Sequence, residues 1–140
     1  MFKKILVGYN GSSGGLMALA QAATLARHDG SQVTALWVAE PMPRYSDLPG
    51  EPEDQVESAA AFFLERTREI QALAAEREIQ IAVDTRRGNP AKTIVTYAQD
   101  GGFDLIVLGH RHSSMWGNLL GHIADRVCDH AHCSVLVVKN

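Results

Sequence analysis

Cysteine is scarce in this chain of 140 residues, which contains only Cys128 and Cys133. The two lie too close together in the sequence to form the disulfide framework of a small secreted protein. No apolar run approaches the roughly 20 residues that a membrane-spanning helix needs. The first residues lead into an apolar run without the features of a signal peptide. These absences predict a cytoplasmic protein that does not span a membrane.

Positive charge is also in short supply. Lys and Arg number 13 against 16 Asp and Glu, which gives a net charge of -3 and a pI near 6.0. Because nucleic-acid backbones attract clustered cations, this balance predicts no nucleic-acid partner. An apolar content of 46% is ordinary for a globular protein, and the length suffices to bury a core. We therefore expect one domain over residues 1–140.

Short apolar runs and helical patterns alternate along the chain. The runs predict strands at Lys4–Val7, Gln32–Ala39, Ile79–Thr85, Leu105–Leu108 and Ser134–Val138. Between them, the patterns predict helices at Leu16–His28, Asp54–Glu78, Pro90–Gln99 and 122–131. Gly30 should end the first helix, and Asn89 should cap the third, with Pro90 in its first turn. This alternation predicts an α/β fold with helices on both faces of a parallel sheet.

Two further segments are informative. Glu40–Glu53, rich in proline and acidic residues, is the longest irregular stretch and suits either a mobile flap or a plain linker. The last strand, extended to Ser134–Lys139, is a continuous apolar run. If it forms the edge of the sheet, its unpaired backbone groups favour a homodimer through that edge.

Two loops rich in glycine and serine or histidine follow predicted strands, at Tyr9–Gly15 and at Gly109–Gly121. A loop that leads from a strand into a helix can bind an anion, because free N–H groups and the helix dipole both favour negative charge there. In doubly wound sheets, ligands bind where the strand order reverses. The order 3-2-1-4-5 would put these loops on either side of that point. The plainer alternative is a pair of turns whose glycines serve backbone geometry alone.

Metal binding and catalysis are the alternatives that the side chains raise. Metal-binding groups occur at His110, His112, His122, Cys128, His130, His132 and Cys133. The spacings typical of a structural zinc site are absent, so two core thiols and a histidine-rich helix end explain them better. In that interpretation Cys128 lies on the apolar side of the last helix.

A catalytic triad can also be drawn from serine, histidine and aspartate side chains, namely Ser12, Ser13, His110 and Asp104. However, the Gly-x-Ser-x-Gly elbow is absent, and nothing in the sequence fixes the geometry of these groups. A binding module is therefore favoured over an enzyme with its own chemistry.

Taken in order, four segments resemble the universal stress protein family, of the UspA type. They are KKILVGYNGS, TALWVAE, RGNPAKTI, and DLIVLG followed by LLGHIADRVCDHAHCSVLVVK. The resemblance covers nearly the whole chain. It implies an open five-stranded parallel sheet of order 3-2-1-4-5, a Rossmann-like fold of the adenine nucleotide alpha hydrolase type. It also implies a cytoplasmic stress-response protein that forms dimers through the last strand.

Many members of that family bind ATP through a Gly-x2-Gly-x9-Gly-Ser loop, and others lack the loop and bind no nucleotide. For this chain the resemblance implies that Asn10 lies near the sugar or base, that the Val38 backbone meets the adenine edge, and that the late loop surrounds the phosphates. The full set of expected contacts is Asn10, Gly11, Ser12, Val38, Gly88, Gly109, Arg111, His112, Gly121 and His122. The expected ligand is ATP or AMP.

The sequence departs from the family pattern at the loop and at the first strand. His112 and His122 stand where glycine and serine or threonine are usual, and the loop is one residue shorter. The two imidazoles either form a pH-sensitive phosphate clamp or fill the phosphate site. Asn10 replaces an aspartate, so Mg²⁺ should be held more weakly.

Two functions follow from these observations. One is a regulatory module whose nucleotide occupancy alters a dimer or partner surface. The alternative is a nucleotide-free module that binds proteins through its dimer and the Glu40–Glu53 flap. Slow ATP hydrolysis is a third alternative, but no residue stands out as its general base.

Overall fold

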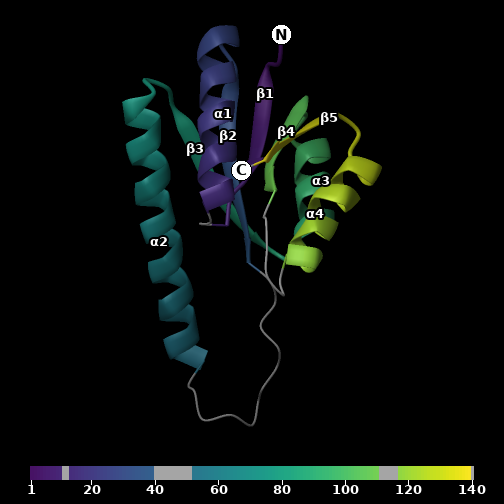
Figure 1. Cartoon of the computed structure of the whole chain (residues 1–140). Helices are drawn as coiled ribbons and strands as arrows, with labels where there is room; N and C mark the ends of the chain where they lie inside the picture. The colour runs from purple at the N-terminus through teal and green to yellow at the C-terminus, as the bar shows by residue number, and fades with distance from the viewer. Residues whose placement is uncertain (11–12, 40–51, 111–116, 140) are drawn as a thin grey trace.

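The computed structural model describes residues 1–10, 13–39, 52–110 and 117–139 (Figure 1). Its elements are β1 (Lys4–Gly8), α1 (Ser13–Asp29), β2 (Gln32–Ala39), α2 (Pro52–Glu76), β3 (Ile81–Arg87), α3 (Pro90–Asp100), β4 (Leu105–His110), α4 (Gly117–His130) and β5 (Ser134–Lys139). All neighbouring strands pair in parallel, in the order β3-β2-β1-β4-β5. This confirms the predicted α/β fold and strand order.

The sheet is covered on both faces, by α1 and α2 on one side and by α3 and α4 on the other (Figure 1). Successive residues of β1 serve opposite layers: Ile5 and Val7 belong to the core under α1 and α2, and Leu6 to the core under α3 and α4. Burying each such side chain contributes about 1.5–3 kcal/mol. Burial on both faces explains why these strands are continuous apolar runs.

The predicted helix ends are confirmed where a glycine or a cap marks them. Gly30 has a φ of 73° and its N–H donates to the Ala26 carbonyl at 2.7 Å, which ends the preceding helix. At the start of α3, the Asn89 side chain accepts from the Lys92 N–H at 3.1 Å, and Pro90 occupies the first turn.

Among the predicted boundaries that differ from the structure, two have a clear physical reason. The third strand begins at Ile81, because Ile79 still belongs to the turn that ends α2: its N–H donates to the Ala74 carbonyl at 3.0 Å. Glu78, with a φ of 58°, reverses the chain there. The last helix begins at Gly117 rather than near residue 122. The helical spacing of Ile123 and Val127 therefore continues towards the N-terminus, through part of the predicted loop.

The start of β1 is tied to the start of β4 by one carboxylate. Asp104 accepts from the backbone N–H groups of Lys3 and Lys4, at 2.8 and 3.0 Å. Partial burial alone would raise the pKa of Asp104, but these two donors outweigh it and lower the pKa. The carboxylate thus fixes the register of the two central strands at their amino ends.

In the described part of the chain, none of the helices combines the length and apolar character that crossing a bilayer requires.

Candidate functional site

The carboxyl ends of β1 and β4, which the two predicted loops follow, lie side by side in the sheet. Val7 is paired with Val107 close to the carboxyl ends of both strands. The strand order reverses between them, since β2 lies beyond β1 and β5 beyond β4. In folds of this kind this position is where ligands bind.

The first turn of α1 packs directly against the end of β4 at Gly109. A Cβ added to Gly109 would lie 2.3 Å from the carbonyl oxygen of Gly14 and 2.4 Å from its carbonyl carbon. No side chain fits, because both neighbouring atoms belong to the backbone of α1. Gly109 therefore allows the N-terminus of α1, with the positive end of its helix dipole, to reach the point where the strand order reverses.

Three other predicted contacts lie along the same edge of the sheet. Asn10 is exposed and follows the end of β1. Val38 lies near the end of β2, where its side chain packs partly buried against the core under α3 and α4. Gly88 follows β3 and has a φ of 147°, and its N–H donates to the Ala39 carbonyl at 3.1 Å. These residues and Gly109 thus lie at or just beyond the ends of four neighbouring strands.

The remaining predicted contacts are placed only in part. Gly11, Ser12, Arg111 and His112 lie outside the described residues, as does the part of the Glu40–Glu53 stretch before Pro52. Gly121 and His122 belong to α4, in its second turn; Gly121 was predicted to end the loop, and His122 to begin the helix.

Sequence reasoning missed the contacts that fix the other side of these strand ends. Tyr9, only 2% exposed, donates its hydroxyl to Glu69 of α2 at 2.6 Å. Burial first, and then this hydrogen bond, raise the pKa of Tyr9, so its hydroxyl remains a donor at neutral pH. Trp37 of β2 stacks on Phe63 of α2, with ring centroids 5.9 Å apart. The sequence signal for the contact between Tyr9 and Glu69 was a tyrosine at the end of a buried strand, because a buried hydroxyl needs a hydrogen-bond partner.

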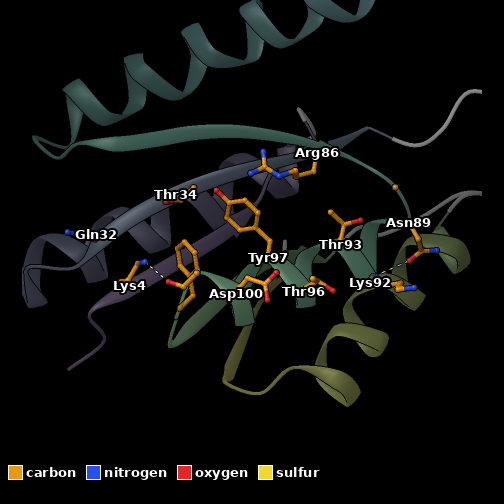
Figure 2. A pocket seen from close by; sticks show the side chains of 13 residues that line it. Lys4, Gln32, Thr34, Arg86, Asn89, Lys92, Thr93, Thr96, Tyr97 and Asp100 are labelled. Atoms are coloured by element: carbon orange, nitrogen blue, oxygen red, sulfur yellow. Dashed lines mark hydrogen bonds between the residues drawn. The ribbon is translucent and has the colours of Figure 1, made fainter.

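A groove of about 890 Å³ runs between α3 and the sheet, from Gly88 to the amino end of β1 (Figure 2). Two of the side chains that line it, Arg86 and Tyr97, are hydrogen-bonded to one carboxylate. Tyr97 donates to Asp84 at 2.8 Å, Arg86 donates to the same carboxylate at 2.7 Å, and the guanidinium lies 5.2 Å from the Tyr97 ring. Among the predicted contacts that the structure describes, only Gly88 lines this groove, so the groove adjoins the predicted site.

The catalytic triad is excluded by the placement of its members. Asp104 immediately precedes β4, whereas His110 is its last residue. At about 3.3 Å per residue, the two are separated by roughly 20 Å. Within residues 1–10, 13–39, 52–110 and 117–139, no three histidine, cysteine or carboxylate side chains lie close enough to bind a metal.

One of the two cysteines does not lie where it was predicted. Cys128 is exposed on α4, so its assignment to the apolar side of the helix was wrong. The apolar face of that helix is formed instead by Ala124 and Val127, which are buried. Cys133 is half-buried against the core, and burial raises the pKa of its thiol.

Comparison with known proteins gives a consistent result. The sequence model of the universal stress protein family matches residues 1–139. Universal stress protein MJ0531 of Methanocaldococcus jannaschii is 32% identical over 142 residues, which cover 99% of this chain and 83% of that protein. Universal stress protein YxiE of Bacillus subtilis is 30% identical over 151 residues, covering 99% and 100%.

Solved structures share the whole fold. Universal stress protein UspA from Lactobacillus plantarum matches with a TM-score of 0.74 and 28% identity, covering 97% of both chains. A universal stress protein in complex with cAMP matches with a TM-score of 0.74 and 22% identity, over 98% of this chain and 97% of that chain. A family member from Arabidopsis thaliana with AMP bound has a TM-score of 0.70 and 20% identity, over 99% and 92%.

Proposed function

Because this chain belongs to the universal stress protein family, we propose that it is a cytoplasmic regulatory module that binds adenine nucleotide, ATP or AMP. The site lies at the carboxyl ends of β1 and β4. One observation carries the proposal: the close packing of Gly14 on Gly109 brings the N-terminus of α1 to the point where the strand order reverses. The N-terminus of a helix favours phosphate there.

The choice of an adenine nucleotide over another anion draws on two proteins with this fold. One is in complex with cAMP and the other has AMP bound. At 22% and 20% identity these matches support the fold and the class of ligand. The residues that contact the ligand must be inferred from this chain itself.

Asn10 and Val38 supply the contacts to the sugar and base in this proposal. Asn10 is exposed beside the end of β1, where its amide can hydrogen-bond a ribose or base. The β1–β2 ladder ends with the Tyr9 N–H, which donates to the Leu36 carbonyl at 3.0 Å. Backbone N–H and C=O groups point to the same side at every second residue of a strand. Those of Val38 therefore point the same way as those of Leu36, towards the adenine edge.

The phosphates are held by the loops and the helix N-terminus. Gly109, His112, Gly121 and His122 surround the phosphates, and the remaining contacts to the nucleotide are Gly11, Ser12, Gly88 and Arg111. Because Asn10 supplies no carboxylate, Mg²⁺ adds little to the binding.

Calorimetry with ATP, ADP and AMP, with and without Mg²⁺, tests this proposal. We expect binding that changes little with Mg²⁺ and is weakened by Asn10→Ala, and adenine nucleotide released when freshly purified protein is denatured. Protein that is purified without nucleotide and gives no heat with any of the three would refute the proposal. It would favour the nucleotide-free interaction module.

The two histidines of the phosphate loop add a pH dependence to the proposal. A bound phosphate favours the charged imidazolium, so AMP affinity rises as pH falls through a pKa raised above about 6.5. We expect His112→Gly and His122→Ser to flatten this dependence between pH 8 and pH 6. Adenosine serves as the control without phosphate. If both substitutions strengthen AMP binding at every pH, the imidazoles obstruct the site.

The module acts as a homodimer that pairs through β5. That strand forms one edge of the sheet, and Leu136 on it is 38% exposed. Sedimentation at micromolar concentration should give a dimer for the wild type and a monomer for Leu136→Lys. Met17→Lys, which places the same charge at an exposed position of α1, should leave the dimer intact. A monomeric wild type contradicts this proposal.

A further inference from the structure

The residue just before Asn10 and the residue just before Val38 both contact α2 through their side chains. We propose that Tyr9 and Trp37 are positioning residues for the nucleotide site, and that α2, through them, sets the place of Asn10 and Val38. This inference rests on the proposed function, and it gives α2 a role in ligand affinity.

Within β2, the alternation of a strand places Trp37 and Val38 on opposite sides of the sheet. Tyr9 belongs to the core under α1 and α2, whereas Asn10 is exposed. Trp37 stacks on aromatic side chains of α2, whereas Val38 packs against the core under α3 and α4. The side chain that precedes each of these two expected contacts is therefore held by α2.

The contacts close into a ring. The Tyr9 hydroxyl donates to Glu69 at 2.6 Å, and Glu69 pairs with Arg66 at 3.1 Å. The Arg66 guanidinium lies 4.8 Å from the ring centre of Phe62. Phe62 and Trp37 have ring centroids 4.9 Å apart. The Tyr9 N–H, bonded to the carbonyl of Leu36 at 3.0 Å, joins the two strands and completes the ring.

This ring resists displacement because its hydroxyl donor is shielded from water, although the Glu69 side chain is 38% exposed. Tyr9 is 2% exposed and the Arg66 side chain 15% exposed. A hydroxyl that loses its carboxylate there has no solvent to replace it, so the strand end must shift to restore a partner. A shift of Tyr9 moves Asn10, which is the next residue.

Two substitutions weaken the ring without removing bulk. Tyr9→Phe removes the hydroxyl donor, and Glu69→Gln replaces the charged acceptor, which also pairs with Arg66, by a weaker neutral amide oxygen. Each should weaken AMP binding about three- to tenfold, because only part of the free energy lost with this hydrogen bond affects the position of Asn10. The double variant should lose no more than the larger single effect, since both substitutions act on the same contact.

The chain offers a matched control for each variant. Tyr97→Phe removes an equivalent phenol-to-carboxylate bond, 2.8 Å from Asp84, on the opposite face of the sheet. Glu76→Gln changes an exposed carboxylate in the last turn of α2. Neither should change AMP affinity by more than about twofold.

Hydrogen exchange provides a second measurement that needs no ligand. The amide of residue 9 should exchange faster in Tyr9→Phe and Glu69→Gln than in the wild type, with no such change in Tyr97→Phe. Urea unfolding of the same proteins separates a loss of stability from a loss of affinity.

The outcomes distinguish the inference from the proposed function. If wild-type protein binds AMP and both ring variants bind it within twofold of wild type, the inference is overturned, even if they are less stable. If the wild type binds no adenine nucleotide, the proposed function fails and hydrogen exchange decides. An unchanged exchange rate at residue 9 in both variants then overturns the inference, and faster exchange in both supports α2 as the element that holds these strand ends.

Discussion

Replacing Gly109 with alanine tests the packing of α1 against β4 most directly. The added Cβ would lie 2.3 Å from the Gly14 carbonyl oxygen and 2.4 Å from its carbon. Non-bonded carbon atoms normally lie about 3.5–4.0 Å apart, so the first turn of α1 must move by more than about 1 Å. Gly14 is buried, and overpacking at buried sites costs about 1–3 kcal/mol. We expect the free energy of unfolding to fall by that amount.

Urea unfolding followed by circular dichroism measures this loss, with Gly30→Ala as the control. Gly30 has a φ of 73° and no atom within 4 Å of an added Cβ, so alanine there meets only backbone strain, about 1 kcal/mol. Gly109→Ala should cost more than Gly30→Ala, and it alone should weaken AMP binding. If the free energy of unfolding of Gly109→Ala lies within about 0.5 kcal/mol of the wild-type value, the backbones of α1 and β4 do not pack closely at this position.

Three further substitutions test other contacts. Asp104→Asn should lower the free energy of unfolding by about 1 kcal/mol at pH 7. The pKa of Asp104 is lowered in the folded protein, so the difference in free energy of unfolding between variant and wild type should shrink as pH falls below about 4. Urea unfolding measures this difference, and a constant value from pH 7 to pH 3 would contradict the prediction. Asn89→Ala removes the cap of α3 and should cost about 1 kcal/mol, measured the same way, with exposed Gln99→Ala as the control. Burial and then the hydrogen bond to Asp84 raise the pKa of Tyr97 to about 12. Tyr97→Phe should therefore cost about 1–2 kcal/mol at pH 7 and less at pH 11, because the stabilisation by the neutral phenol is lost as pH rises towards 12; thermal unfolding at the two pH values is the measurement.

The arrangement of the elements could be predicted because each strand is a local apolar run bounded by glycine or a cap. Gln32–Ala39 was predicted to the residue. Boundaries failed where a local signal pointed to the wrong structure. Ile79 has the apolar character of a strand residue, but it packs on the core from the turn that ends α2. Glycines at the start of α4 resemble a loop, although the helix continues through them.

The candidate site divides in a similar way between local and distant information. Gly109 was predicted from the glycines of its loop, and its contact with Gly14 adds a reason that the sequence does not carry. The bond between Tyr9 and Glu69 joins residues 60 positions apart, with no motif between them. The groove under α3 is lined from several separate segments, so no single stretch of sequence indicates it.

The bonds from Lys3 and Lys4 to Asp104 have a consequence for how the chain folds during synthesis. They join residues 101 and 100 positions apart, at the centre of the sheet. Strands β1, β2 and β3 leave the ribosome well before β4, so a nascent half-sheet carries an open, apolar edge at Ile5, Leu6 and Val7. Such an edge invites pairing with other chains until β4 arrives. Strand β1, whose three central residues are fully buried in the finished protein, is thus the strand most prone to pair with other chains before synthesis is complete.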